Sequence, residues 1–340
     1  MKKIFDENIL EEVLTWVEMN LNVVLATVVS TWGSSPRPIS SQMIVNSKSN
    51  FSGSVSGGCV EINVIRECKK LISEKKLFKK IEFSVSDDEA WEVGLACGGK
   101  INIFLEKIDK SKKKLLKKII EKQKKKKSFA VITNLNDGKS FLFEKNKKVD
   151  KKFKKNLKKI NLYFSNKKNG IIKNTNIFIK NFNRPTKVII VGAVHIAQHL
   201  INFATNLNFE IILIDPRKTF VLNKKYSGIK IINKWPNKAF DDIEVDKDSA
   251  LVTLTHDPKI DDLAIQYALN NNFFYIGSLG SKKTHSNRCL RLKKAGFASN
   301  KIKKINGPIG FKLGGKTPPE IALSIISQLV YESYKKLKVI

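Results

Sequence analysis

The sequence predicts an α/β protein, in which an N-terminal α+β domain precedes a Rossmann-like domain built on a parallel sheet. Three observations predict this fold class. The chain has 340 residues, which is enough for two or three domains. Before residue 108, short strands mix with amphipathic helices around two loops rich in Gly and Ser. After residue 186, strands alternate with helices, which is typical of a parallel, doubly wound sheet.

The N-terminal domain is expected at residues 1–107. Apolar residues at helical spacing predict two amphipathic helices, at 4–19 and 60–74. Four strands are predicted, at 23–30, 42–45, 80–85 and 101–106. The Gly-, Ser- and Pro-rich loops 31–38 and 52–59 connect these elements.

Residues 108–185 are expected to form a lysine-rich connecting subdomain. Helices are predicted at 112–125 and 151–159, because apolar residues such as Leu116 and Ile120 keep one face free of lysine. Short strands are predicted at 129–134, 140–143 and 177–180. Pro185 marks the boundary, because a proline favours an extended chain before it.

The C-terminal domain is expected at residues 186–340. It opens with a strand at 188–191, a helix at 194–207 and a strand at 210–214, which together form a βαβ unit. Later strands are predicted at 250–254 and 273–276. A last helix begins after Thr317, which is followed by Pro318 and, three residues on, by Glu320, as in a capping box.

The net charge of +32 comes from lysine far more than from arginine. Lys and Arg together number 63 against 31 acidic residues, and only six of the 63 are arginines. Nucleic-acid-binding proteins favour arginine for bidentate and stacking contacts. We therefore interpret the lysines, which are densest between residues 110 and 185, as solvated surface. Nucleic acid is not among the expected partners.

Neither a membrane nor a secretory route is expected. No apolar run reaches the ~18 residues of a membrane span, and Asp6 and Glu7 interrupt the N-terminus where a signal peptide would be apolar. Four scattered cysteines are too few for a disulfide framework at this length. The sequence predicts a cytoplasmic protein with reduced thiols.

The turn Gly192-Ala193-Val194-His195 lies between a predicted strand and a predicted helix, as in dinucleotide-binding folds. Asp215 ends the next strand, where such folds place an acidic residue against a ribose. Val194 departs from the fingerprint, because a glycine there normally lets the backbone approach the pyrophosphate. The Rossmann-like fold is predicted, while NAD(P) binding and an NAD(P)-dependent oxidoreductase remain the alternative.

Three loops follow predicted strands of the same sheet, at 215–217, 255–257 and 277–281. Parallel strands bring their carboxyl ends to one edge, which is where ligands bind in open α/β sheets. We expect a polar cleft there that contains His195, Arg217, His256 and Ser281.

Cys59 and Cys97 are the cysteines with glycine neighbours. Cys59 follows Gly57 and Gly58 and opens a helix, where free amides and the helix dipole favour a thiolate, although Glu61 in the same turn works against it. Cys97 precedes Gly98 and Gly99, which allow a ligand to approach the backbone. Both are candidates for function, whereas Cys68 and Cys289 are expected to be structural.

Nine short motifs, taken in order, resemble the XdhC/CoxI family. They are Gly33–Pro38, Ser56–Glu61, Cys97–Gly99, Gly192–Ala197, Asp215–Arg217, Thr255–Asp257, Tyr275–Gly277, Pro308–Gly310 and Thr317–Ala322. The resemblance covers about residues 10–107 and 186–332 and omits the lysine-rich segment. One departure is Ser40, where the family pattern has a glycine.

The resemblance implies a maturation factor with no turnover of its own. Such proteins bind the molybdenum cofactor (molybdopterin), protect it while its terminal sulfido ligand is installed, and insert it into a molybdenum hydroxylase such as xanthine dehydrogenase. The implied partners are the hydroxylase apoenzyme and a cysteine desulfurase, with a homodimer left open. Cys59 and Cys97 are implied as reactive groups and metal ligands, because thiolates suit molybdenum. The implied cofactor-binding residues are Arg37, Gly57, Gly58, Glu61, Gly98, Gly99, Gly192, His195, Asp215, Arg217, His256, Gly277 and Ser281.

Overall fold

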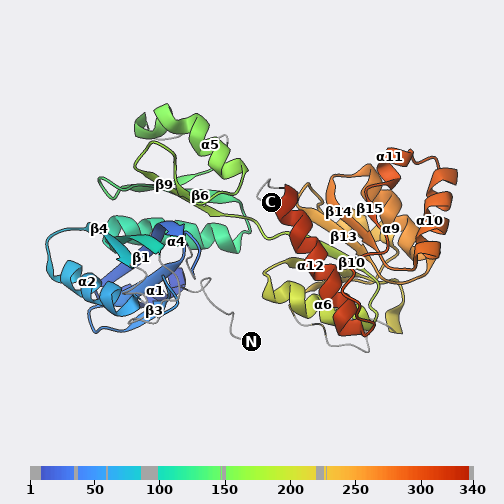
Figure 1. The fold of residues 1–340 in the computed structure, drawn as a ribbon, viewed down its shortest axis with the longest axis horizontal. Helices are drawn as coiled ribbons and strands as arrows, with labels where there is room; N and C mark the ends of the chain where they lie inside the picture. The colour runs from blue at the N-terminus through green and yellow to red at the C-terminus, as the bar shows by residue number, and fades with distance from the viewer. Residues whose placement is uncertain are drawn as a thin grey trace. The chain divides into compact units, whose positions relative to one another are not determined.

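The chain folds into two compact units, Met1–Arg184 and Pro185–Ile340 (Figure 1). The computed structural model describes residues 9–33, 37–58, 60–85, 99–145, 147, 151–219, 226 and 228–336. The lysine-rich segment belongs to the first unit, where it shares a core with the N-terminal residues. Among the helices in these ranges, none combines the length and the apolar character needed to span a membrane.

The first unit is built on a five-stranded antiparallel sheet, sheet A, in the order β3-β2-β1-β5-β4. Its strands are β1 (Val23–Gly33), β2 (Gln42–Asn46), β3 (Phe51–Gly53), β4 (Phe78–Val85) and β5 (Gly99–Lys107). β1 is longer than predicted, and residues 31–33 are strand where a loop was expected. The physical reason is that pairing with β5 resumes after an irregularity between Val28 and Ser30 and continues to the pair Gly33 and Gly99.

Helix α2 (Glu61–Ser73) covers one face of sheet A. Its apolar residues recur at helical spacing, and Val64, Cys68 and Leu71 are completely buried against β1, β2 and β5. The exposed side of the helix carries charged residues, which explains why it lies on the sheet as a single amphipathic layer.

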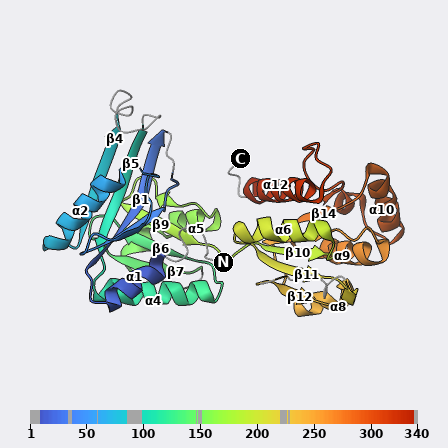
Figure 2. The same cartoon turned by 90° about the horizontal axis from the view of Figure 1, so that it is seen from below.

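The other face of sheet A packs on α1 (Ile9–Glu18), on α4 (Lys110–Lys124) and on a second sheet. α1 and α4 lie side by side (Figure 2). Although most residues of α4 are lysines or other polar residues, the helix buries Leu116, Ile119 and Ile120 on one face. The segment is thus an ordinary amphipathic helix with a lysine-rich outer side.

Sheet B is antiparallel, in the order β7-β6-β9-β8. Its strands are β6 (Phe129–Asn134), β7 (Ser140–Phe143), β8 (Gly170–Ile171) and β9 (Ile177–Phe182). A 3-10 helix, η1 (Lys151–Asn156), and α5 (Leu157–Ser165) cover its outer face. The first unit is therefore layered, with helices outside and two sheets within.

The second unit contains a six-stranded parallel sheet in the order β12-β11-β10-β13-β14-β15. Its strands are β10 (Lys187–Val191), β11 (Glu210–Ile214), β12 (Lys230–Ile232), β13 (Ser249–Thr253), β14 (Phe273–Ser278) and β15 (Ile305–Asn306). In chain order this is 3-2-1-4-5-6, the order of the dinucleotide-binding Rossmann fold. The predicted fold class is confirmed.

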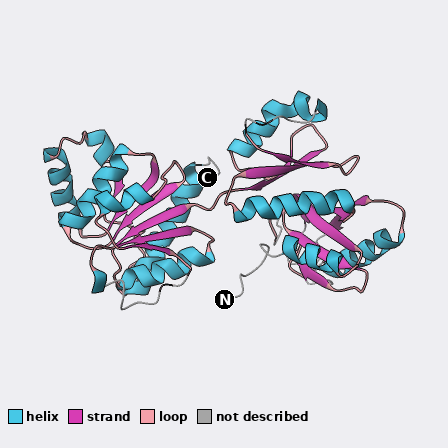
Figure 3. Cartoon of the chain, turned by 180° about the vertical axis from the view of Figure 1, so that it is seen from behind, coloured by secondary structure: helices cyan, strands magenta, loops and turns pink. Residues whose placement is uncertain are grey.

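Helices cover both faces of the parallel sheet (Figure 3). On one face, Val188 and Ile190 of β10 pack beneath α6 (His195–Asn206) and α12 (Pro318–Lys336). On the other, Ile189 and Val191 pack beneath the remaining helices. These are α8 (Pro236–Ala239), η2 (Phe240–Asp242), α9 (Pro258–Asn270), α10 (Lys282–Lys294) and α11 (Ser299–Ile302). Burial on both faces explains the continuous apolar run in β10.

Replacing Leu71 by Ala is expected to destabilise the first unit by about 2–5 kcal/mol, because it leaves a cavity between α2 and sheet A. Ile62→Ala, on the same helix but 72% exposed, is the matched control and should change stability by about 0.5 kcal/mol or less. Equilibrium urea denaturation followed by circular dichroism measures both. Equal effects would contradict the packing described for α2.

Candidate functional site

Three loops that carry predicted site residues leave the same end of sheet A. β1 ends and β5 begins at the pair Gly33 and Gly99, and β4 ends at Val85, which also pairs with Gly99 (Figure 2). β3 runs parallel to β1, because each pairs antiparallel with β2, so the chain after Gly53 heads toward the same end. The chain therefore leaves β1, β3 and β4 toward the same end of sheet A.

The predicted residues at this end are only partly described. Cys59, Cys97 and Gly98 lie outside the described residues, as does the segment 34–36. Their chain neighbours Gly58 and Gly99 are described. Arg37 is half-buried in the loop that follows β1. In the described ranges no three His, Cys, Asp or Glu side chains gather to hold a metal ion. Cys59 and Cys97 are not among these residues, so their role as thiolate ligands stays a prediction.

The carboxylate of Glu61 organises the loop that precedes Cys59. One oxygen accepts hydrogen bonds from Ser54 Oγ at 2.7 Å and from the backbone N–H groups of Val55, Ser56 and Gly57 at 3.2, 2.9 and 3.0 Å. The other accepts from the Gly58 N–H at 2.9 Å and from the Ser56 hydroxyl. The loop 54–58 is thus wrapped around a single side chain.

This arrangement strongly favours the charged form of Glu61. Burial alone would raise the pKa of the carboxyl, but the hydrogen bonds from Ser56 and Ser54 outweigh it and lower the pKa from 4.5 to about 2. The ion is therefore retained at every physiological pH. We interpret Glu61, expected as a cofactor-binding residue, as a residue whose hydrogen-bonding capacity is taken up by its own loop.

The expectation of free amides beside Cys59 is wrong for the residues on either side of it. The N–H groups of Gly57 and Gly58 donate to Glu61, and that of Val60 donates to Ser56 Oγ at 3.0 Å. Both glycines have positive φ, 88° and 129°, which accounts for glycine in this turn. A Cβ at Gly58 would meet no atom of the described residues within 4 Å.

The second unit brings its predicted residues to the carboxyl edge of the parallel sheet. His195 opens α6 after β10, Arg217 follows β11, His256 follows β13, and Ser281 caps α10 after β14. The chain order reverses between β10 and β13, the place where open α/β sheets bind ligands. His195 and His256, which flank this point, are both exposed.

Asp215 is completely buried and fully engaged by protein groups. Its carboxylate accepts from the Ala193 N–H at 2.8 Å and from the Arg217 N–H at 3.0 Å. Arg217 also donates through Nε and Nη2, at 2.9 and 2.8 Å. Burial alone would raise the pKa of Asp215, but the hydrogen bonds from Arg217 and Ala193 outweigh burial and lower the pKa. Both carboxylate oxygens of Asp215 and the backbone N–H of Ala193 are therefore occupied by hydrogen bonds within the protein. They are not available to bind a dinucleotide, which argues against NAD(P).

Asp261 holds the turn that presents His256. It accepts from the Thr255 hydroxyl at 2.7 Å and the Thr255 N–H at 3.3 Å, and His256 adopts a left-handed backbone with φ of 62°. A Cβ at Gly192 would lie 2.8 Å from Thr255 Cγ2, so the glycine is needed for the two loops to touch. Burial raises the pKa of Asp261 to about 6, while Thr255 and the Arg288 guanidinium limit the rise.

Gly277 and Ser281 have structural roles visible in the second unit. Gly277 lies inside β14, where a Cβ would come within 2.5 Å of Ile309 Cδ1. Ser281 accepts from the Thr284 N–H at 3.1 Å as the N-cap of α10. Packing and capping explain these two residue types without a ligand.

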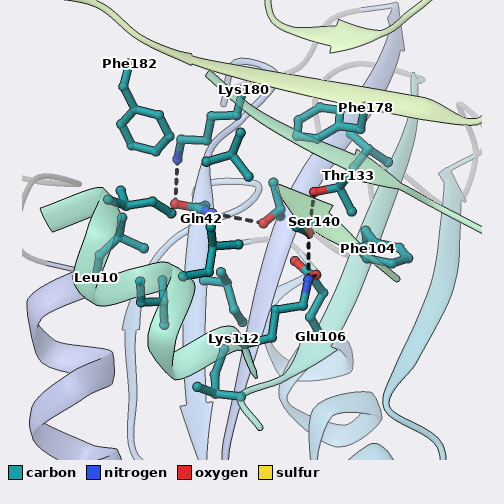
Figure 4. A pocket seen from close by; sticks show the side chains of 18 residues that line it. Leu10, Gln42, Phe104, Glu106, Lys112, Thr133, Ser140, Phe178, Lys180 and Phe182 are labelled. Atoms are coloured by element: carbon teal, nitrogen blue, oxygen red, sulfur yellow. Dashed lines mark hydrogen bonds and ion pairs between the residues drawn. The ribbon is translucent and has the colours of Figure 1, made fainter. Parts of the chain in front are cut away.

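A cavity between sheets A and B, with a mostly apolar lining that includes several polar side chains, could not be anticipated from the sequence motifs (Figure 4). Lys112 Nζ donates to Glu106 and, at 2.7 Å, to Ser140 Oγ, which lies 2.8 Å from Thr133 Oγ1. Across the cavity, Lys180 donates to Gln42. Burial raises the pKa of Glu106, and Lys112 opposes that rise. The cavity volume is about 50 Å³, room for a few waters but not for a pterin.

The sequence matches two models of known protein families. Residues 188–329 match the XdhC Rossmann domain, and residues 16–79 match the XdhC and CoxI family. The chain belongs to the XdhC/CoxI family. The two matches include the Glu61 loop of the first unit and all four strand-end loops of the second.

The relatives of this XdhC/CoxI chain align over nearly its whole length. A probable xanthine dehydrogenase subunit from Bacillus subtilis is 25% identical over 93% of this chain and 94% of its own. The molybdenum cofactor insertion chaperone PaoD from Escherichia coli is 24% identical over 90% and 82%. A crystal structure described as a xanthine dehydrogenase from Bacillus halodurans has a TM-score of 0.75 at 23% identity and 96% coverage of both chains, and shows the same fold.

Glu61→Gln is expected to destabilise the first unit by about 1–3 kcal/mol at neutral pH, because an amide cannot accept from both sides of the loop. The folded pKa lies below the ordinary value, so the stabilisation is complete above pH 4.5 and is lost as pH falls toward 2. Thermal unfolding of both proteins between pH 2 and 7 tests this. Glu67→Gln, which breaks surface ion pairs on the same helix, should cost less than about 1 kcal/mol.

Asp261→Asn is expected to remove a pH dependence from the second unit. Because the folded pKa is raised from 3.8 to about 6, ionisation opposes folding, so stability is greatest below pH 3.8 and falls by about 1–3 kcal/mol as pH rises through 6. In urea denaturation, the free energy of unfolding of the variant should change less with pH across this window than that of the unmodified protein. Asp257→Asn, at the N-cap of α9, is the control, and an unchanged slope in Asp261→Asn would contradict the assignment.

Proposed function

We propose that this XdhC/CoxI-family protein binds the molybdenum cofactor as cargo, protects it during sulfuration and inserts it into a xanthine dehydrogenase-like molybdenum hydroxylase. The observation that supports the proposal is that β3, β4 and β5, the described strands that adjoin the Cys59 and Cys97 segments in sequence, have the ends next to those segments directed to the same end of sheet A. Support also comes from the relatives, one named as a molybdenum cofactor insertion chaperone. The protein would act as a carrier, not as an enzyme with its own turnover.

The residues near the cysteines suit such a cargo. Thiolates are soft ligands that suit molybdenum, so Cys59 and Cys97 would hold the metal. The Glu61 bonds keep the 54–58 loop in one conformation before the cargo arrives, which reduces the ordering cost of binding. Gly57, Gly58 and Gly99 would let the cargo approach the backbone, and Arg37 would supply a positive charge for its phosphate.

The carboxyl edge of the second unit offers the other binding surface. His195 begins a twelve-residue helix whose N-terminus favours anions. The exposed imidazole of His256 and the N-cap Ser281 would add hydrogen bonds. Asp215 contributes by fixing Arg217 and the Gly192 turn, as its four contacts suggest. Gly277 would serve only by keeping β14 close to Ile309.

The partners follow from this role. The hydroxylase apoenzyme would receive the cargo, and a cysteine desulfurase would supply the sulfur. A cytoplasmic location agrees with Cys68 and Cys289, which are free thiols. An NAD(P)-dependent oxidoreductase is the alternative, and the saturated Asp215 and the Val194 side chain count against it. Incubating the protein with molybdenum cofactor or with NAD(P), followed by gel filtration and analysis of the co-eluting ligand, separates the two.

Cys59→Ala is expected to abolish or strongly weaken cofactor binding while the fold is retained, because it removes one soft ligand. Cys97→Ala should have a similar or smaller effect. Molybdenum and pterin co-eluting with each variant are the measurement, with circular dichroism as the fold check.

Cys68→Ala and Cys289→Ala are the matched controls. Burial raises the pKa of the Cys68 thiol to about 12, so it stays protonated and cannot serve as a ligand. Both controls should bind cofactor normally. If Cys59→Ala and Cys97→Ala bind as well as the unmodified protein, the thiol site is wrong and the carboxyl edge of the second unit becomes the primary candidate.

A further inference from the structure

The turn that follows Arg37 has a backbone conformation that serine rarely adopts. The Ser41 N–H donates to the Pro38 carbonyl at 3.1 Å and closes a β-turn over residues 38–41. Ser40, the third residue of this turn, has a φ of 79°. A positive φ at that position is typical of a type II turn, which favours glycine. The glycine of the family pattern at position 40 therefore has a conformational reason, and in this chain other contacts hold the serine in its place.

Sheet B supplies two of these contacts. Asn169, the residue before β8, donates through Nδ2 to Ser40 Oγ at 3.0 Å. Lys180 of β9 donates through Nζ to the Ser40 carbonyl at 3.1 Å. The same Nζ donates to Gln42, the first residue of β2 (Figure 4). Both the side chain and the carbonyl of Ser40 are thus held by residues that lie far along the chain.

Asn169 is itself held in place by β9. Its Oδ1 accepts from the Asn181 N–H at 2.8 Å, and Asn181 Nδ2 donates to the Lys168 carbonyl at 2.7 Å. Ile39, the other central residue of the turn, packs on an apolar cluster that includes residues of both sheets. Sheet B and its flanking residues therefore support the turn at both of its central positions.

The position of Arg37 depends on this turn. Pro38 begins the turn and directly follows Arg37, and a proline restricts the residue before it to extended conformations. A movement of the turn would therefore carry the Arg37 backbone with it. Asn169 and Lys180 lie between the two segments that match the family, 16–79 and 188–329, so the matched segments alone do not contain this support.

We propose that Asn169 and Lys180 are positioning residues, which hold the Ser40 turn so that Arg37 can bind the phosphate of the cargo. The inference rests on the proposed function, in which Arg37 supplies the positive charge for that phosphate. In this role neither side chain contacts the cargo. A turn that is held before the cargo arrives lowers the ordering cost of binding. The lysine-rich segment, interpreted from the sequence as solvated surface, thereby takes part in the site.

Hydrogen exchange of the full-length protein, followed by mass spectrometry of peptides that contain residues 38–41, measures how firmly the turn is held. Asn169→Ala and Lys180→Met should each speed exchange at the Ser40 and Ser41 amides at least about fivefold, because the turn opens more often. Ser40→Gly, alone or with Asn169→Ala, should exchange as slowly as the unmodified protein, because glycine adopts a positive φ without support. Lys158→Met, at an exposed position of α5, is the matched control and should change nothing.

Binding of the molybdenum cofactor and of its dephosphorylated form, measured by gel filtration and analysis of the co-eluting pterin, tests the role of the turn. Asn169→Ala and Lys180→Met should bind the phosphate-bearing form at least about fivefold more weakly, because a displaced Arg37 loses its charge-assisted contact. Both variants should bind the dephosphorylated form like the unmodified protein. Adding Ser40→Gly to Asn169→Ala should restore the affinity for the phosphate-bearing form. A role in stability alone would not distinguish the two forms.

The outcomes separate this inference from the proposed function. Unchanged exchange in both Asn169→Ala and Lys180→Met would overturn the support of the turn, whichever ligand binds. Faster exchange with unchanged affinity, in a protein that binds the cofactor, would overturn the positioning role and leave the proposed function standing. If the unmodified protein binds neither form of the cofactor, the proposed function is wrong and this inference is wrong with it.

Discussion

The candidate site of the first unit depends on one buried carboxylate. Glu61 gathers four consecutive backbone N–H groups, from Val55 to Gly58, and two serine hydroxyls. Without that charge, a Gly-rich loop of this kind would sample many conformations, because glycine restricts the backbone least. The carboxylate lies at the first residue of α2, so it also benefits from the positive end of the helix dipole. Loop and helix are fixed by the same ion.

The second unit uses buried acids in the same way. Asp215 joins the Gly192 turn to Arg217, and Asp261 joins the Thr255 turn to α9. Hydrogen bonds outweigh burial at Asp215 and lower its pKa, whereas at Asp261 burial outweighs the hydrogen bonds from Thr255 and raises the pKa. The acidic residues thus shape the loops, while His195 and His256 between them are exposed. This division explains why a Rossmann-type sheet here need not bind a dinucleotide.

Much of the fold could be predicted from the sequence because periodicity and local signals agree. The βαβ unit after Lys187 and the capping box at Thr317 are examples, and Glu320 does accept from the Thr317 N–H at 2.9 Å. The end of β1 could not be predicted, because Thr31 to Gly33 become strand only by pairing with the distant segment that begins at Gly99.

The candidate site was harder to predict than the fold. The free amides were predicted wrongly because Glu61 was treated as a charge near the thiol and not as an acceptor for the loop. The cavity between the sheets was missed because its polar residues come from separate strands and from helix α4. Polar residues on otherwise apolar strand faces, such as Thr27 and Thr133, were the available signal.

The burial of Cys68 has a consequence for the thiol chemistry of the first unit. Oxidants and electrophiles react with the thiolate, and a thiol that stays protonated inside a packed core offers none. The other two cysteines of this unit, Cys59 and Cys97, belong to the proposed cargo site. Oxidative damage to the unit would therefore fall on that site while α2 and sheet A stay packed. A carrier inactivated in this way would still be a folded protein, and reduction of a disulfide or a sulfenic acid formed at the two loop cysteines would restore the thiols without refolding.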